Sequence, residues 1–307
     1  MSSCLDTRPS SGAPTTGEAE PTKSRIEVAL AGALSRAEVG GPPLLAAAMR
    51  HAVFPGGARV RPQLCLAVAR ACGDPLPALS DAAASAIELI HCASLVHDDL
   101  PCFDDAALRR GRPSVHRAYG EPLAVLVGDG LIVLAFETLT RGGAEAPARL
   151  IPLLTTLCRA TGAPSGLVAG QAWESEPSAE LQRYHRAKTG GLFTAATVSG
   201  ALAAGQDGDR WRALGDRLGA AYQVADDLLD VVGKPEELGK PVRRDATLAR
   251  PSAVAELGLR GALDRLRSLL AEAVESIPAC PGEDQLRDLV LRQAARLVPE
   301  GLAQTAA

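Results

Sequence analysis

The chain has 307 residues, of which 47% are hydrophobic and 22% charged, so it is long enough for one large domain or two ordinary ones. A net charge of −4 provides no global positive field that would recruit nucleic acid. Seven scattered cysteines, with no Cys-x-x-Cys pair, argue against a disulfide framework or a zinc site and indicate a reducing, cytoplasmic setting.

The N-terminal residues 1–22 are rich in Ser, Thr, Pro, Gly and Glu, which predicts a disordered tail without the apolar core of a signal peptide. One domain is expected over residues 23–307. The longest apolar run, residues 123–139, is interrupted by Gly128, Asp129 and Gly130, so no membrane span is predicted.

From Ile26 onward, long segments dominated by Ala, Leu, Arg and Glu recur between breaks rich in Gly and Pro. No alternating strand pattern and no repeat of fixed period interrupt them. The pattern predicts a single all-α domain, a helical bundle of ten or more helices. The breaks lie near residues 40–43, 54–57, 73–77, 142–147, 205–208, 233–251 and 278–282.

An apolar helix in the first half of the chain ends in two adjacent carboxylates, Asp98 and Asp99. Pro101 cannot sit in a helix interior, so we expect a break there that folds Asp104 back towards Asp98. Clustered carboxylates repel one another unless a cation lies among them, and hard oxygen ligands suit Mg²⁺, which shares its coordination shell with phosphates. The alternative is a solvated acidic loop, which would not need an apolar helix leading into it.

A second acidic cluster comprises Asp226, Asp227 and Asp230 within an apolar helical pattern. Asp226 and Asp230 are four residues apart and share one helix face, where like charges destabilise an isolated helix. Gln223, one turn earlier, lies near the same face. The alternative, an exposed acidic turn, fits poorly because apolar residues flank the cluster on both sides. Two such clusters predict one metal–diphosphate site between facing helices.

Cationic side chains accompany both clusters, and arginine can hold phosphate oxygens bidentately. Taken singly, each is more often an ordinary surface charge. Lys188 is followed by a hydroxyl, Thr189, and His91 lies on the apolar helix, where it is either a satisfied core histidine or a ligand. The other cations are Arg59, Arg61, Arg109, Arg110, Lys240, Arg243, Arg244 and Arg250.

In combination, these motifs resemble the trans-isoprenyl diphosphate synthase family, the head-to-tail prenyltransferases, over residues 26–296. The two acidic clusters match its aspartate-rich motifs, and the pairs 188–189, 222–223 and 239–240 also match. The resemblance implies an isoprenoid synthase bundle around a central cavity, acting as a homodimer. Ala58, Glu174 and the arginine-rich loop 243–250 look most like the geranylgeranyl diphosphate synthases of phototrophic bacteria, which serve carotenoid and bacteriochlorophyll pathways.

The resemblance also implies roles for individual residues. Three Mg²⁺ ions, for which Mn²⁺ could substitute, would join an allylic diphosphate to the aspartates, and a second set of side chains would hold isopentenyl diphosphate. The metal ligands would be Asp98, Asp104 and Asp226, with Asp99, Asp227 and Asp230 supporting; the allylic diphosphate would contact Arg109, Lys188, Thr189, Gln223 and Lys240; isopentenyl diphosphate would contact Arg61, His91 and Arg110.

Product length should depend on the residues four and five positions before Asp98, which are Ser94 and Ala93. Both are small, which favours a deep cavity and a C20 product over the C15 product of a farnesyl diphosphate synthase. The chain departs from the family at Ala58, where a lysine that contacts isopentenyl diphosphate is usual. Either Arg59 or a residue elsewhere replaces that charge, or the affinity for isopentenyl diphosphate is lower.

Two other functions remain open. A class I terpene cyclase or squalene-type synthase shares the metal–diphosphate chemistry, but cyclases commonly line their pockets with aromatic side chains, and aromatics are only 3% of this chain. A non-catalytic subunit of a heteromeric synthase is the second alternative. Loss of an acidic cluster would favour it, whereas here both clusters are intact and Ala58 alone points that way.

Overall fold

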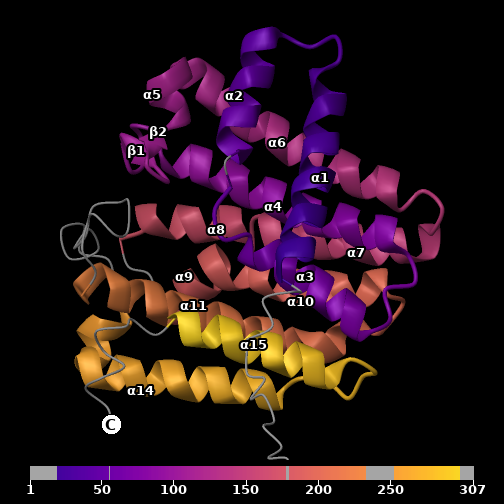
Figure 1. Cartoon of the computed structure of the whole chain (residues 1–307). Helices are drawn as coiled ribbons and strands as arrows, with labels where there is room; N and C mark the ends of the chain where they lie inside the picture. The colour runs from indigo at the N-terminus through magenta and orange to yellow at the C-terminus, as the bar shows by residue number, and fades with distance from the viewer. Residues whose placement is uncertain (1–18, 55, 178–179, 233–251, 298–307) are drawn as a thin grey trace, which may run out of the picture.

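A computed structural model describes residues 19–54, 56–177, 180–232 and 252–297. Within these ranges the chain is helical apart from connecting loops and one short hairpin, which confirms the predicted all-α bundle of ten or more helices (Figure 1). In chain order the elements are α1 (Ala19–Glu38), α2 (Pro43–Val53), α3 (Val60–Ala71), α4 (Pro77–Asp98), β1 (Leu108–Arg109), β2 (Arg112–Pro113), α5 (Val115–Tyr119), α6 (Glu121–Gly142), α7 (Pro147–Thr161), α8 (Leu167–Ala172), η1 (Trp173–Ser175), α9 (Leu181–His185), η2 (Arg186–Gly190), α10 (Gly191–Ala203), η3 (Gly208–Trp211), α11 (Arg212–Val232), α14 (Ala253–Glu275) and α15 (Glu283–Leu297).

The predicted Gly/Pro breaks fall between helices wherever the structure describes them. Two features of the fold differ from the sequence prediction. Helix α1 begins at Ala19, inside the stretch predicted as a tail, because Thr22 packs against the bundle and accepts a hydrogen bond from Arg70. The strands β1 and β2 were not predicted, since two residues per strand are too few to show an alternating pattern.

Helix α4 lies at the centre of the bundle, where it packs against α3, α6 and α10 (Figure 1). Most of its residues are buried, and many of them are alanine or serine, which lets neighbouring helices approach it closely. On the other side of the molecule, α14 packs along α11 and α15 lies against α3 and α14. The two acidic clusters therefore lie on different helices of one core, at the end of α4 and near the end of α11.

Two helices, α4 and α6, are long and apolar enough to cross a membrane by length and composition alone. In α4 that apolar window is 83% buried inside the bundle, as in the core helix of a globular protein. In α6 only 44% of the corresponding window is buried, so one side of this helix presents apolar residues to the surface. Helix α6 continues without a break through Gly128, Asp129 and Gly130, the three residues that interrupt the apolar run in the sequence.

One close backbone contact brings two parts of the pocket wall together. A Cβ atom at Gly170 of α8 would lie 2.3 Å from the backbone nitrogen of Lys188 and 2.4 Å from its Cα. Only glycine therefore lets α8 lie directly on the segment that carries Lys188. This contact places Gln171, the next residue on α8, at the same end of the bundle as Lys188.

We predict that Gly170→Ala destabilises the protein by about 1–3 kcal/mol, the usual cost of overpacking, because backbone atoms must move apart. Gly32→Ala is the control: its Cβ would meet only the flexible Arg36 side chain at 3.6 Å, so alanine should stabilise helix α1 by roughly 0.5–1 kcal/mol. Urea unfolding measures both. Equal effects of the two substitutions would contradict the close contact.

Candidate functional site

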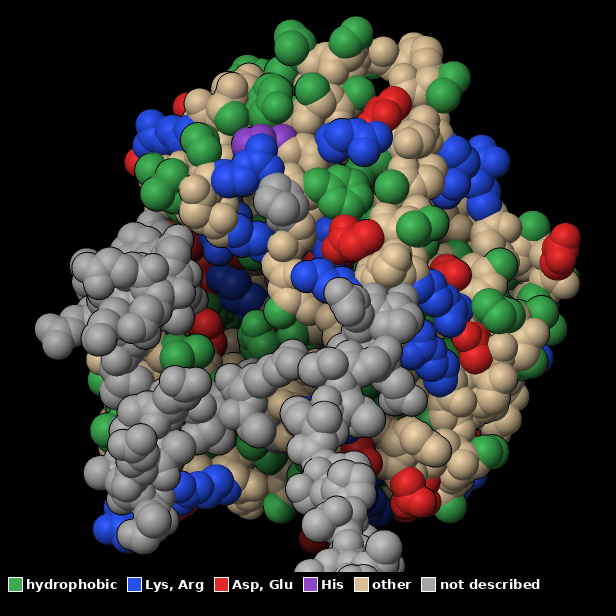
Figure 2. All heavy atoms as spheres, viewed as in Figure 1, with side chains coloured by type: hydrophobic (Ala, Val, Ile, Leu, Met, Phe, Trp, Pro, Cys, Tyr) green, Lys and Arg blue, Asp and Glu red, His purple; other side chains and the backbone are tan. Residues whose placement is uncertain are grey.

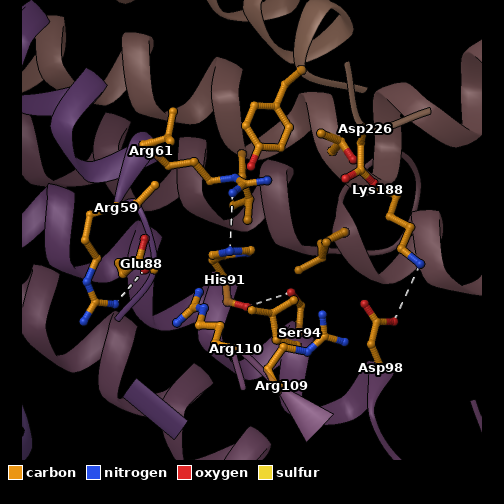
Figure 3. Close-up of a pocket in the computed structure, with 18 of the residues that line it drawn as sticks. Arg59, Arg61, Glu88, His91, Ser94, Asp98, Arg109, Arg110, Lys188 and Asp226 are labelled. Carbon is orange, nitrogen blue, oxygen red and sulfur yellow. Dashed lines mark hydrogen bonds and ion pairs between the residues drawn. The ribbon is translucent and has the colours of Figure 1, made fainter. Parts of the chain in front are cut away.

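A pocket of about 330 Å³ opens between α3, α4, the β1–β2 hairpin, η2 and α11. Its wall is strongly polar for a bundle interior, and Figure 2 shows Lys/Arg and Asp/Glu side chains together in a hollow of the surface. Ten of the predicted site residues line it, several of them labelled in Figure 3: Arg61, His91, Ser94, Asp98, Arg109, Arg110, Lys188, Thr189, Gln223 and Asp226.

The first acidic cluster folds as predicted. Helix α4 ends at Asp98, and the chain then turns back so that the backbone N–H of Asp104 donates to the carbonyl oxygen of Asp98 at 2.9 Å. Two further backbone bonds, from Asp105 to Leu100 and from Ala106 to Asp99, hold the same turn. The break around Pro101 thus brings the third aspartate of the motif beside the first.

The carboxylate of Asp98 faces the pocket and is held from two sides. Gln171 donates its side-chain N–H to Asp98 Oδ1 at 2.9 Å, and Lys188 Nζ lies 3.7 Å from the same oxygen. Burial raises the pKa of Asp98, whereas the Lys188 charge and the Gln171 hydrogen bond oppose that rise. A further cation near this carboxylate would favour its ionised form.

Asp99, the next residue, turns into the protein instead. It is 2% exposed and forms an ion pair with Arg109, whose Nε donates to it at 3.1 Å. Burial raises the pKa of Asp99, and the hydrogen bond from Arg109 works against this. Asp99 therefore fixes the guanidinium of Arg109 at the pocket wall, and does not itself line the pocket.

The second acidic pair divides in the same way. Asp226 lines the pocket, while Asp227 is 2% exposed and accepts hydrogen bonds from the backbone N–H of Ala253 at 2.7 Å and from Gln223 at 2.9 Å. Asp227 thereby satisfies the first N–H of helix α14 and orients Gln223. Asp230 is buried one turn further along α11 and is not a pocket-lining residue.

Lys188 and Thr189 lie on the π-helical turn η2, an irregularity that often marks functional sites. Lys188 forms an ion pair with Glu174, which also accepts a hydrogen bond from the hydroxyl of Tyr184 at 2.6 Å. Thr189 donates to the side-chain oxygen of Gln223 at 2.8 Å. Figure 3 shows the ammonium of Lys188 beside Asp98 and Asp226, and Thr189 adds a hydroxyl to the lining of the same pocket.

A second basic group lies at the other end of the pocket (Figure 3). Arg61 points its guanidinium at His91, with 3.4 Å between Nη1 and Nε2, and stacks on the ring of Phe193 with 4.7 Å to the centroid. Burial, and then the charges of Arg61 and Arg110, hold the pKa of His91 well below 6.5. His91 is therefore neutral and available as an acceptor from Arg61 or as a hydrogen-bond donor to an anion.

Arg59, one of the candidates to replace the charge that Ala58 lacks, is paired within the protein in this structure. Its side chain is fully buried, donates to Glu27 and to the carbonyl oxygen of Val53, and forms an ion pair with Glu88 at 2.8 Å. Arg59 is among the residues that line the pocket, but its guanidinium is already paired with these acceptors inside the protein. Lys240, Arg243, Arg244 and Arg250 lie outside the described residues.

The two predicted chain-length residues differ in position. Ser94 lines the pocket and donates its hydroxyl to the carbonyl oxygen of His91 at 2.8 Å. Ala93 is 1% exposed and lies behind the pocket wall. The apolar part of the wall is supplied by Leu95, Leu167 and Leu192.

Sequence reasoning did not assign Gln171 and Tyr184 to the site. Both act through a neighbour, Gln171 on Asp98 and Tyr184 on Glu174. The sequence carries a weak signal for Gln171, since it follows the close-packed Gly170 and precedes the acidic Glu174 by three residues. Tyr184 carries none, because only the packing of α9 brings it near α8.

The donor chemistry of this site fits Mg²⁺. Asp98 and Asp226 offer hard carboxylate oxygens to one pocket, with the cationic side chains of Arg109 and Lys188 beside them. Within the described ranges, no three His, Cys, Asp or Glu side chains already gather closely enough to enclose a metal ion. This arrangement suits ions whose remaining ligands come from substrate phosphate and water.

Comparison with known proteins agrees with this geometry. The model of the polyprenyl synthetase family matches residues 42–286. The chain is 57% identical to a geranylgeranyl diphosphate synthase of Cereibacter sphaeroides, over 92% of this chain and 98% of the relative, and 53% identical to one of Rhodobacter capsulatus, over 89% and 95%. A crystal structure of a Helicobacter pylori geranyltransferase complexed with magnesium and isoprenyl diphosphate is similar, with a TM-score of 0.77, 30% identity and coverage of 93% of this chain and 100% of that one.

The fold and the pocket define an enzyme that transfers prenyl groups. Its structural neighbours include geranyltransferases, which share the same helical bundle. The chain belongs to the polyprenyl synthetase family.

We predict that the neutral state of His91 makes the protein acid-sensitive. Because its folded pKa lies below 6.5, the unfolded chain binds more protons as the pH falls through about 6.5, and the folded state loses stability. Between pH 6.5 and 5.5 the wild type should lose about 1 kcal/mol more unfolding free energy than His91→Asn. Urea titrations at the two pH values measure this difference, and parallel losses would show that His91 does not remain neutral.

Proposed function

We propose that this enzyme is a geranylgeranyl diphosphate synthase, which condenses isopentenyl diphosphate head-to-tail with an allylic diphosphate and releases pyrophosphate. The observation that carries the proposal is the division of one pocket into two anion sites. Asp98, Asp226 and Lys188 lie at one end, and the basic group of Arg61 and His91 lies at the other. A transferase with two diphosphate substrates requires both ends.

The allylic diphosphate occupies the end with the aspartates. Arg109, fixed by Asp99, and Lys188 supply positive charge, while Thr189 and Gln223 supply hydrogen bonds. Lys188 is paired with Glu174 and Asp98 in the free protein, so the diphosphate exchanges one anionic partner for another. The bound charges stabilise the pyrophosphate as the C–O bond of the allylic carbon breaks.

Mg²⁺ fits the same end, where Asp98, Asp104 and Asp226 would hold it. When bound, it supplies Lewis-acid stabilisation of the leaving pyrophosphate. We expect three ions per site, with Mn²⁺ able to replace them. Asp99 and Asp227 support these ligands through Arg109 and Gln223.

Isopentenyl diphosphate occupies the other end, held by Arg61, Arg110 and neutral His91. Its double bond attacks the allylic cation, forming the new carbon–carbon bond, and a proton then leaves, with the departing pyrophosphate as the acceptor. The leucines of the wall exclude water, which would otherwise quench the cation. Because Ala58 carries no charge and the guanidinium of Arg59 is already paired with Glu27 and Glu88, this diphosphate has one cation fewer than is usual in the family.

A C20 product follows from the small residues Ala93 and Ser94 on α4, the helix along which the growing chain runs. The two relatives that this chain covers over 98% and 95% of their own length are named geranylgeranyl diphosphate synthases, which supports the same product. A farnesyl diphosphate synthase of Geobacillus stearothermophilus, 40% identical over 80% of this chain and 84% of its own, supports the C15 alternative less strongly.

We also propose that the enzyme is a cytoplasmic homodimer that supplies carotenoid biosynthesis. The exposed apolar residues Val125, Leu126 and Val133 on α6 support the dimer, because a partner subunit could cover them. A cyclase fits less well: among the pocket-lining residues the structure describes, Tyr222 is the only aromatic, and a cyclase has no use for the second basic group.

Product analysis tests the proposal. The purified protein is incubated with Mg²⁺, labelled isopentenyl diphosphate and each of dimethylallyl, geranyl and farnesyl diphosphate. A C20 diphosphate is the expected product. A hydrocarbon would indicate a cyclase, absence of product would indicate a non-catalytic subunit, and a C15 diphosphate would indicate a farnesyl synthase.

In the same assay, Ala93→Tyr should shift the main product towards C15. Ala93 is buried next to Ser94, so a tyrosine ring at 93 must displace the wall and shorten the apolar cavity. Ala93→Ser is the control and should leave the product unchanged. If the tyrosine variant also makes C20, Ala93 does not form the floor of the cavity.

A further inference from the structure

The β1–β2 hairpin carries two phosphate-binding arginines but has almost no structure of its own. Its register pairs Leu108 with Pro113 and Arg109 with Arg112, which leaves Arg110 and Gly111 as a two-residue turn. Both turn residues have positive φ angles, 53° at Arg110 and 74° at Gly111. This is the arrangement of a type I′ turn, in which a non-glycine residue such as Arg110 is strained.

Strands of two residues cannot hold such a turn unaided, because even a longer isolated hairpin is only marginally stable. Arg109 has its own anchor in the ion pair with Asp99. Among the residues that the structure describes, Arg110 forms no ion pair with a carboxylate; its guanidinium instead lies over Gly57, where an added Cβ would be 3.0 Å from Nε. The position of Arg110 therefore depends on how the hairpin is fixed to the chain before α3.

That attachment is made by Arg112 and His51, which lie on the side of the hairpin that meets helix α2. Arg112 donates from Nη1 to the carbonyl oxygen of Phe54 at 2.7 Å and from Nη2 to His51 Nδ1 at 2.9 Å. His51 Nε2 lies 2.8 Å from the carbonyl oxygen of Pro113. These three bonds close a ring between the end of α2 and strand β2.

The ring selects one state of His51. A guanidinium can only donate, so Nδ1 must accept and carries no proton. The Pro113 carbonyl can only accept, so Nε2 must donate. The neutral ring is further positioned by Tyr119, whose centroid is 5.4 Å away in an edge-on arrangement. A side chain at position 51 must therefore offer an acceptor and a donor at the same time.

We propose that His51 and Arg112 are positioning residues that set the location of Arg110, and through it the affinity of the enzyme for isopentenyl diphosphate. This inference rests on the proposed function only for the identity of that substrate. Neither residue is a phosphate ligand in this arrangement: Arg112 is used by Phe54 and His51, and neither side chain lines the main pocket. The allylic end should be insensitive to them, because Asp99 holds Arg109 independently.

The test compares His51→Gln with His51→Leu. Glutamine keeps an acceptor and a donor on one side chain, whereas leucine has neither. His51→Leu should raise the KM for isopentenyl diphosphate by about tenfold, the usual scale for displacing one charge-assisted contact, and leave the KM for the allylic substrate within about twofold. His51→Gln should stay close to wild type in both. Arg50→Gln, on the same helix, is the matched control and should change neither, because Arg50 is paired with Glu38 and not with the hairpin in the part of the chain that the structure describes.

A second variant shows whether the two residues act as a unit. Arg112→Gln should reproduce the effect of His51→Leu, and the double variant should be no worse than either single one, because each breaks the same ring. Thermal unfolding of every variant identifies any that fail to fold. If an Arg112 variant fails to fold, the comparison of His51→Gln with His51→Leu decides whether the proposal holds. Equal rises in both KM values, or identical behaviour of His51→Gln and His51→Leu, would overturn the proposal.

Inorganic pyrophosphate binding, measured by calorimetry in EDTA so that no divalent metal ion draws pyrophosphate to the aspartate end, separates this inference from the proposed function. If the wild type makes no prenyl diphosphate, the proposed function fails. The positioning role is then judged on pyrophosphate affinity, which His51→Leu should weaken by about tenfold and His51→Gln should preserve. Equal affinities in the two variants would overturn it there as well.

Discussion

Each of the two adjacent aspartate pairs is divided between the pocket and the protein interior, and the site depends on that division. Successive side chains on a helix point about 100° apart, so two neighbouring carboxylates cannot both face one pocket. Asp98 and Asp226 line the pocket, while Asp99 and Asp227 are almost completely buried. The two buried aspartates each hold a side chain of the pocket: Asp99 holds Arg109, and Asp227 holds Gln223.

This division also links the site to the fold. Asp227 accepts from the first N–H of α14, so the helix that covers α11 is attached at the residue next to Asp226. On the opposite wall, Gly170 allows α8 to touch the backbone of Lys188, and Gln171 on α8 then holds Asp98. Burial raises the pKa of Asp98, which makes this carboxylate costly to keep charged until cations join it.

Much of the architecture and half of the site could be predicted from sequence. Helices were predicted because Gly and Pro mark their ends, and the fold-back of Asp104 followed from Pro101. Side-chain partners could not be predicted, because they are decided by packing between distant segments. Arg59 pairs with Glu88, which is 29 residues away in the sequence, and Arg112 bonds to His51, which is 61 residues away. The Arg-Gly sequence of the hairpin turn was the one local sign that β1 and β2 exist.

We propose that the first aspartate of each pair binds the metal and that the second orients a side chain that binds phosphate. Electron paramagnetic resonance can count Mn²⁺ ions bound per chain in the presence of pyrophosphate. Asp98→Asn should bind fewer ions than the wild type. Asp99→Asn should bind the wild-type number once pyrophosphate is saturating, while requiring more pyrophosphate to reach it. Loss of the same number of ions in both variants would contradict the account.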